Sequence, residues 1–180
     1  PDLGSALTLI PIAAAVLFLA GFPLRYFGLI LLAGVLALPV GYHFLKPYQK
    51  NRIATFLNPE ADPKNTGYQV MQSRIAIGSG EIWGKGMGQG TQTQLRFLPV
   101  AHTDFILSII GEELGFFGAF GVICLFIIFI WQGARIAKRV TDPFGYFLSV
   151  GVVAMIGLQA MVNVGVSMGA LPTKGLPLPF

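Results

Sequence analysis

Asp104 stands where a long polar segment meets an almost charge-free apolar run, in the sequence His102-Thr103-Asp104-Phe105. A carboxylate held at such a boundary can act as a general base, and His102 could position or polarise a reacting group. The same carboxylate could instead cap the following helix, by accepting hydrogen bonds from the N–H groups of its first turn. The residue pattern leaves both roles open.

Two adjacent acids, Glu112 and Glu113, lie inside the apolar run that follows Asp104. Carboxylates in such runs are costly, so they are usually functional or paired with another charge. If one helix continues from Asp104, Glu112 lies about 12 Å further along it and about 80° around its axis, with Glu113 on the opposite side. Glu112 could then line the same cavity as Asp104, and Glu113 would pair with another helix. A structural ion pair is the alternative for both.

A glycine-rich segment and several basic side chains could bind an anion near these acids. The segment 78–90 contains six glycines and Lys85, and Arg96 follows it. Its backbone N–H groups could bind phosphate, but it lacks the lysine-serine ending of a phosphate-binding P-loop. Close packing of this loop against a neighbouring helix is the alternative.

Two polar patterns predict helix contacts. Residues 68–77 form a short amphipathic helix in which Tyr68, Met71 and Ile75 share a face, so this helix could lie at a membrane interface or pack on the protein. In the last apolar run, a polar residue recurs at every fourth position, which predicts hydrogen bonds to a neighbouring helix. The polar residues of this run are Gln159, Asn163 and Ser167.

These residues belong to a chain whose composition predicts a membrane protein. Of the 180 residues, 54% are hydrophobic and 11% are charged, whereas soluble domains carry about 25% charged residues. One cysteine cannot form a disulfide framework. The net charge of +4 lacks the basic stripe on a soluble face that nucleic-acid binding needs. We therefore expect an all-α fold that crosses the membrane several times.

Four runs are long enough to cross a bilayer, which takes about 20 mostly apolar residues. The expected transmembrane helices cover about residues 3–22, 26–45, 105–134 and 143–170.

The short loop 135–142 contains Arg135, Lys138 and Arg139. Dense basic charge in a short loop is typical of the cytoplasmic side. The long loop 46–104 and the tail 171–180 are then extracytoplasmic. The chain starts without Met, and we expect it to be a segment of a longer protein.

Several sequence blocks, in order along the whole chain, resemble the SEDS family of bacterial cell-wall proteins, which comprises RodA, FtsW and SpoVE. The most specific blocks are His102-Thr103-Asp104-Phe105, Gly111-Glu112-Glu113-Leu114-Gly115, Asn163-Val164-Gly165 and Leu171-Pro172-Thr173-Lys174-Gly175-Leu176-Pro177-Leu178-Pro179-Phe180. Further blocks are Pro1-Asp2-Leu3-Gly4-Ser5-Ala6, Asn58-Pro59-Glu60 and Gln72-Ser73-Arg74-Ile75-Ala76-Ile77-Gly78-Ser79-Gly80. Details such as Gly90-Thr91-Gln92-Thr93-Gln94-Leu95 slightly favour RodA over FtsW. Val100 departs from the glutamate common at this position in both.

The resemblance implies a ten-helix glycosyltransferase of the bacterial cytoplasmic membrane, of which this chain would contain spans six to nine. It implies lipid II as the substrate, polymerised into glycan strands on the outer face. It also implies a class B penicillin-binding protein as partner, docked against the later spans, and Asp104 as the catalytic aspartate. We expect the isolated 180-residue segment to be inactive.

This chemistry suits the available residues. A sugar hydroxyl that attacks an anomeric carbon must lose a proton, so one carboxylate suffices as the base. The lipid pyrophosphate leaves without protonation if cations balance its charge, whereas a glycoside hydrolase needs two carboxylates. The candidate cations for pyrophosphate are Arg52 and Lys174 first, then Lys46, Arg74, Lys85 and Arg96. A divalent cation, Mg or Mn, could also bind at Asp104, although the sequence shows no dedicated cluster of oxygen ligands.

Two other functions remain open from the sequence. A lipid II flippase could use Glu112, Glu113 and the polar positions of the last span as a proton-coupled path. A non-catalytic scaffold could only position the penicillin-binding protein. Both would tolerate the loss of the Asp104 carboxylate during glycan synthesis, and a polymerase would not.

Overall fold

The computed structural model describes residues 3–57, 66–91 and 105–172, and within them every regular element is a helix. The expected all-α fold is therefore confirmed. The helices are α1 (Leu3–Leu19), α2 (Leu24–Phe44), α3 (Pro47–Leu57), α4 (Thr66–Ser79), α6 (Ile106–Ala137) and α7 (Pro143–Ser167).

The four expected spans coincide in sequence with α1, α2, α6 and α7. Of the described helices, α6 and α7 are long and apolar enough to cross a membrane, and α1 and α2 contain the shorter apolar stretches Thr8–Leu19 and Leu24–Pro39. The helix expected within the long loop, over residues 68–77, is present as α4. The structure adds α3 in the same loop.

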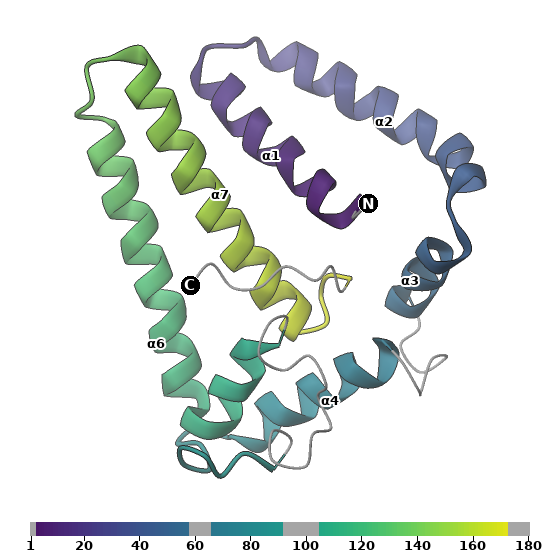
Figure 1. The fold of residues 1–180 in the computed structure, drawn as a ribbon, viewed down its shortest axis with the longest axis vertical. Helices are drawn as coiled ribbons and strands as arrows, with labels where there is room; N and C mark the ends of the chain where they lie inside the picture. The colour runs from purple at the N-terminus through teal and green to yellow at the C-terminus, as the bar shows by residue number, and fades with distance from the viewer. Residues whose placement is uncertain (1–2, 58–65, 92–104, 173–180) are drawn as a thin grey trace.

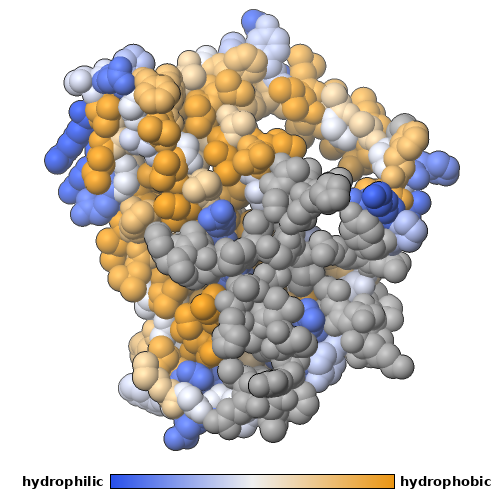
Figure 2. Space-filling model, in the orientation of Figure 1, coloured by the Kyte–Doolittle hydropathy of each residue, from blue (hydrophilic) through white to orange (hydrophobic). Residues whose placement is uncertain are grey.

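α7 is the central helix of the bundle, because it packs against both α6 and α1 (Figure 1). The α1–α2 turn and the α6–α7 loop lie at the same end of the molecule, and α4 lies at the opposite end. Figure 2 shows mostly hydrophobic residues between these ends and hydrophilic residues gathered toward them. This distribution suits helices that cross a bilayer between two polar interfaces.

Local chemistry explains the two tight connections. Gly21 adopts φ +83° after α1, a left-handed conformation that ends many helices and that glycine adopts without steric cost. At the start of α7, the Asp142 carboxylate accepts a hydrogen bond from the Gly145 N–H at 2.8 Å, and Pro143 occupies the first turn. Both are standard helix boundaries. Arg135 stacks over the Trp131 ring at 4.0 Å near this end, as expected for a side chain at a membrane interface.

The buried core lies where α4, the start of α6 and the end of α7 meet. Val70, Phe105, Val162 and Val166 are buried there. The face of α4 that contains Val70, Ser73 and Ala76 is buried against this core. On its other side, Met71 is 40% exposed and Ile75 is 49% exposed. α4 therefore packs on the protein, which is one of the two placements expected for it, and its Met71 and Ile75 side chains face outward; its contact with a membrane interface stays a prediction.

Candidate active site

α6 is interrupted at Gly115, whose dihedral angles are φ 67° and ψ −161°. The part of α6 before this residue (106–114) and the part after it (116–137) run in different directions, and Figure 1 shows the change of direction near the N-terminal end of α6. The expected continuous helix over 105–134 is therefore divided. Glu112 lies next to the turn between the two parts rather than within the long apolar part.

The glycine-rich loop after α4 supplies the hydrogen bonds that the interruption removes. The Lys85 N–H donates to the Glu112 carbonyl at 2.9 Å, and the Gly86 N–H donates to the Glu113 carbonyl at 3.0 Å. In the other direction, the Phe116 N–H donates to the Glu81 carbonyl at 2.9 Å. Helix ends buried away from water need such partners. The loop thus acts as a cap for both new helix ends.

Three glycines make this contact possible, because each approaches backbone on the facing segment. A Cβ on Gly80 would overlap the Gly111 carbonyl, and a Cβ on Gly84 would overlap the Glu113 carbonyl. A Cβ on Gly115 would overlap the backbone of Gly84 and the preceding loop. These contacts match the packed-loop interpretation of the glycine-rich segment. The N–H groups of Lys85 and Gly86 are used by helix carbonyls rather than presented to a phosphate.

An ion pair that is partly buried joins the same loop to α6. The Lys85 Nζ lies 2.7 Å from the Glu112 Oε1, and the side chains are 29% and 0% exposed, respectively. The Thr91 hydroxyl accepts from the Lys85 Nζ at 2.9 Å and donates to the Glu112 Oε1 at 2.9 Å. A carboxylate buried in an apolar helix needs such partners. The structure thus brings two of the candidate residues together, as partners of each other.

A second polar cluster connects α4, α6 and α7. The Ser73 hydroxyl of α4 donates to the Ser167 carbonyl of α7 at 2.6 Å. The Ser73 and Ser108 hydroxyl oxygens are 2.6 Å apart. Since Ser73 has one hydroxyl proton, Ser108 of α6 donates to it. Of the predicted polar positions on α7, Asn163 and Ser167 are buried, and they lie at this junction.

Arg74 bonds to the end of α7. Its Nε donates to the Met168 carbonyl at 3.1 Å and its Nη2 donates to the Gly169 carbonyl at 3.2 Å. A cation at this position complements the negative end of the helix dipole. Arg74 was a candidate ligand for pyrophosphate, and the structure gives it helix carbonyls as partners.

The remaining candidate residues are placed as follows. Lys46 is exposed immediately before α3, Arg52 belongs to α3 without a described side chain, and Glu113 is half-buried beside the loop. Outside the described residues lie Arg96, His102, Asp104 and Lys174. The N-cap position of α6 belongs to Phe105, one residue after the aspartate that the sequence nominated for it.

Thr91, Ser73 and Ser108 were not singled out by the sequence. The sequence offered a weak indication for Ser73 alone. Ser73, Ala76 and Gly80 form a face of small residues at helical spacing, which favours close approach of helices. Within the described residues, no group of three or more His, Cys, Asp or Glu side chains could hold a metal ion. The cation expected at Asp104 therefore remains a prediction.

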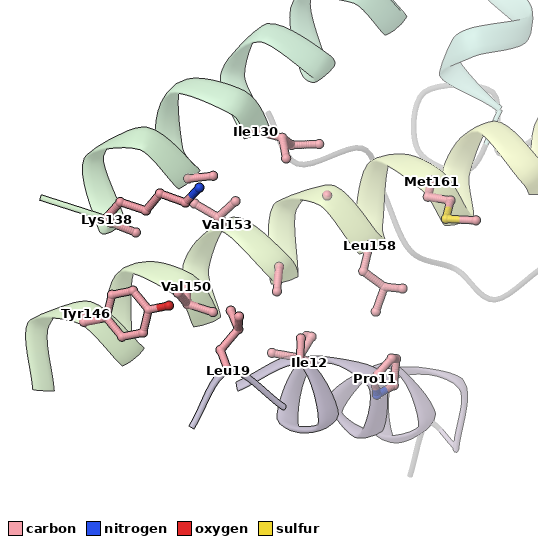
Figure 3. A pocket seen from close by; sticks show the side chains of 15 residues that line it. Pro11, Ile12, Leu19, Ile130, Lys138, Tyr146, Val150, Val153, Leu158 and Met161 are labelled. Atoms are coloured by element: carbon pink, nitrogen blue, oxygen red, sulfur yellow. The ribbon is translucent and has the colours of Figure 1, made fainter. Parts of the chain in front are cut away.

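The groove among α1, α6 and α7 has no comparable chemistry (Figure 3). Its volume is about 450 Å³, and Pro11, Ile12, Leu158 and Met161 are among its apolar walls. Lys138 is the charged residue in its lining. Because the described lining of the groove contains no carboxylate, the polar junction of α4, α6 and α7 is the better candidate for catalysis.

Comparison with known proteins identifies the family. The family model described as a cell cycle protein, FtsW/RodA/SpoVE, matches residues 1–180, the entire chain. The chain belongs to this family. It is a membrane protein of the SEDS type, as the sequence blocks indicated.

The relatives that the chain matches are named as FtsW and stage V sporulation proteins. Over 181 residues the chain is 50% identical to "Probable peptidoglycan glycosyltransferase FtsW" of Geobacter metallireducens, covering 99% of this chain and 47% of the relative. It is 40% identical to "Stage V sporulation protein E" of Bacillus subtilis, covering 100% of this chain and 49% of the relative. These names belong to the division and sporulation members, whereas sequence details slightly favoured RodA.

A solved structure has the same fold. Its description is "Structural coordination of polymerization and crosslinking by a peptidoglycan synthase complex". The TM-score is 0.76 at 30% sequence identity, with 99% of this chain and 49% of that chain covered. The chain thus spans about half the length of the relatives that it matches.

Proposed function

We propose that the full-length protein is a glycosyltransferase that polymerises lipid II on the outer face of the bacterial cytoplasmic membrane, in cell division or sporulation. The observation that carries this proposal is the family match over all 180 residues, together with relatives named as peptidoglycan glycosyltransferases at up to 50% identity. The short loop 135–142, with its three basic residues, supports the orientation.

In this reaction Asp104 is the general base. It accepts the proton of the attacking sugar hydroxyl as the new glycosidic bond forms at the anomeric carbon, and the lipid pyrophosphate departs with its electron pair. Arg52, Lys46, Arg96 and Lys174 are the candidates to balance the pyrophosphate charge. Arg74 and Lys85 are less suited, since each already binds protein oxygen atoms.

The proposed partner is a class B penicillin-binding protein that crosslinks the strands made here. The similar solved structure supports this choice, because its description refers to a complex that couples polymerization to crosslinking. Surrounding membrane lipids are the other neighbours, since apolar side chains such as Leu31 at 71% and Leu36 at 69% are exposed along α2.

Asp104→Asn tests the catalytic role. In the full-length protein with its partner, supplied with purified lipid II that needs no flipping, we expect glycan polymerisation to fall about 100-fold or more, because a positioned base contributes about 10²–10⁴ to the rate. The measurement is the initial rate of glycan formation. Polymerisation at the wild-type rate would overturn the proposal and leave the flippase or the scaffold.

Asp142→Asn is the matched control. It makes the same chemical change at the N-cap of α7, a position where asparagine also caps a helix well. We expect this variant to polymerise at the wild-type rate. Equal co-purification of the partner with all three proteins would show that Asp104→Asn acts on chemistry and not on assembly.

A further inference from the structure

The groove among α1, α6 and α7 is apolar along most of its length. Its volume of about 450 Å³ lies within the range of about 300–1,000 Å³ that is usual for ligand pockets. Small residues line it on α1 and α7, among them Ala15, Ala154 and Gly157. Along α7 the lining runs from Tyr146 to Met161, which is about 22 Å at 1.5 Å per residue. One leaflet of a bilayer is about 15 Å deep, half of the hydrocarbon core, so the groove can hold an extended acyl chain.

Lys138 and Tyr146 make one end of this groove polar. Figure 3 shows both side chains reaching toward the groove, Lys138 from the end of α6 and Tyr146 from the first turn of α7. Among the described residues, the Lys138 ammonium group has no ion-pair partner. A lysine stem packs along apolar surface while its charged head stays in a polar environment, and a tyrosine hydroxyl can donate a hydrogen bond. This end therefore offers an anion both a cation and a hydrogen-bond donor.

The charge around this end also favours an anion. Four basic residues lie in or beside the α1–α2 turn and the α6–α7 loop, which share one end of the molecule (Figure 1): Arg25, Arg135, Lys138 and Arg139. The acid in these two connections is Asp142, and its carboxylate accepts a hydrogen bond from the Gly145 N–H at 2.8 Å. Clusters of basic side chains beside transmembrane helices attract anionic lipid headgroups. The net positive charge thus lies at the polar end of the groove.

An anionic phospholipid matches both parts of the groove, because it joins a phosphate to acyl chains in the order in which the groove presents its cation and its apolar walls. Free phosphate would use the polar end alone. An apolar helix from the rest of the full-length protein would use the apolar walls alone and bring no anion to Lys138. Basic pockets between transmembrane helices are typical sites for anionic headgroups. The charge complementarity therefore favours a lipid over a protein segment.

We propose that this groove is a binding site for one anionic phospholipid, taken from the leaflet at the end where the α6–α7 loop lies. One acyl chain lies along α7 between α1 and α6, and the phosphate is bound by the Lys138 ammonium and the Tyr146 hydroxyl. The site is independent of the proposed chemistry at Asp104. A variant that cannot polymerise lipid II should still bind this phospholipid.

Lys138→Gln tests the headgroup contact. The full-length protein, purified in a neutral detergent, is titrated with palmitoyl-oleoyl phosphatidylglycerol, and native mass spectrometry counts the bound lipid. We expect the wild type to bind one phosphatidylglycerol in preference to phosphatidylethanolamine with the same chains. Lys138→Gln should weaken this binding about 5-fold, the effect of one cation near an anionic lipid. Tyr146→Phe should weaken it about 3-fold through the lost hydrogen bond.

Arg139→Gln is the matched control for the charge. It removes a neighbouring positive charge of the same loop, and Arg139 is not among the described residues that line the groove. At physiological salt the attraction of an exposed cation is largely screened, so the affinity should change by less than about 2-fold. Equal losses for Lys138→Gln and Arg139→Gln would overturn the site, because the loop would then attract lipids without a specific contact. Equal affinity for the two headgroups would also overturn it.

Ala154→Leu tests the acyl-chain contact, because the larger side chain occupies the groove. We expect the affinity for phosphatidylglycerol to fall about 10-fold, since excluding even two methylene groups has an effect of this order. Without added lipid, the unfolding temperature should not change. Ala13→Leu makes the same change at an exposed position of α1 that is not in the described lining, and it should bind lipid as the wild type does.

A different result is expected if a helix of the full-length protein fills the groove. Ala154→Leu would then lower the unfolding temperature and leave the affinity for phosphatidylglycerol unchanged. That result would overturn the lipid site, and so would equal losses of affinity in Ala154→Leu and Ala13→Leu. Neither result would bear on the proposed function, which Asp104→Asn tests separately.

Discussion

The junction of α4, α6 and α7 and the groove among α1, α6 and α7 share two helices but are held together differently. At the junction, Ser73, Ser108 and Glu112 are fully buried and joined to their neighbours by directed hydrogen bonds. The groove is lined mainly by aliphatic side chains and leaves about 450 Å³ open.

The difference reflects what a bilayer offers to each kind of contact. Lipid tails are as apolar as leucine, so apolar helix faces gain little from association beyond close packing. Polar groups removed from water must form hydrogen bonds within the protein. Because each hydrogen bond needs a particular distance and direction, the helices of a hydrogen-bonded junction are held in a defined geometry. The junction of α4, α6 and α7 is therefore held in one defined geometry, whereas the apolar groove can tolerate changes in its side chains.

The largest expected effect comes from Gly115→Ala, which places a Cβ against the backbone of the facing loop. The dihedral angles of Gly115 are nearly exclusive to glycine, and a Cβ would overlap the Gly84 backbone. We expect the free energy of unfolding to fall by about 3 kcal/mol or more. Thermal unfolding of the full-length protein in detergent measures this change.

Gly121→Ala is the control, since Gly121 lies later in the same helix and an added Cβ there would meet no atom within 4 Å. It should leave the unfolding temperature unchanged or slightly raised, as alanine favours helix. Equal effects of the two substitutions would show that the interruption of α6 is unimportant for stability.

The positions of the long apolar helices could be predicted from the sequence, but the interruption of α6 could not. The apolar runs predicted where α1, α2, α6 and α7 lie in the sequence, because length and absence of charge suffice to recognise a long apolar helix. Gly115 could not be distinguished from the other glycines of its run, such as Gly118 and Gly121. Its conformation is imposed by a loop about 30 residues earlier in the chain, and that contact is not visible in local periodicity.

The candidate site was predictable in the same partial way. Because a buried charge is costly, the sequence predicted that Glu112 and Glu113 need partners. The choice between them depended on the loop: Glu112 meets Lys85, whereas Glu113 uses its backbone carbonyl. Thr91 could not be recognised from the sequence, because neutral hydroxyl groups are common on exposed surfaces, and Ser73 had only its place on a face of small residues. Asp104 lies outside the described residues, so its role stays a prediction.

An intermediate effect is expected from Ser73→Val, which removes one hydroxyl from the junction. The substitution leaves the Ser167 carbonyl and the Ser108 hydroxyl without their shared partner. We expect a loss of about 1–2 kcal/mol in the free energy of unfolding, because polar contacts between membrane helices average somewhat less than 1 kcal/mol each and the abandoned groups are buried.

Ser149→Ala is the matched control for Ser73→Val. The Ser149 hydroxyl bonds to the Gly145 carbonyl of its own helix at 2.8 Å and joins no two helices. Its removal should change stability by less than about 0.5 kcal/mol. If Ser149→Ala were as destabilising as Ser73→Val, hydrogen bonds between helices would have no special role at the junction.

The smallest effect is expected where the groove is filled. Ala154→Leu adds three carbon atoms to the wall of the space among α1, α6 and α7. Since this space is open, the larger side chain need not displace its neighbours, and the unfolding free energy should change by less than about 0.5 kcal/mol. Thermal unfolding of the full-length protein again gives the measurement. A loss of about 2 kcal/mol or more would mean that another part of the full-length protein packs into the groove, which would make it a precise contact like the junction.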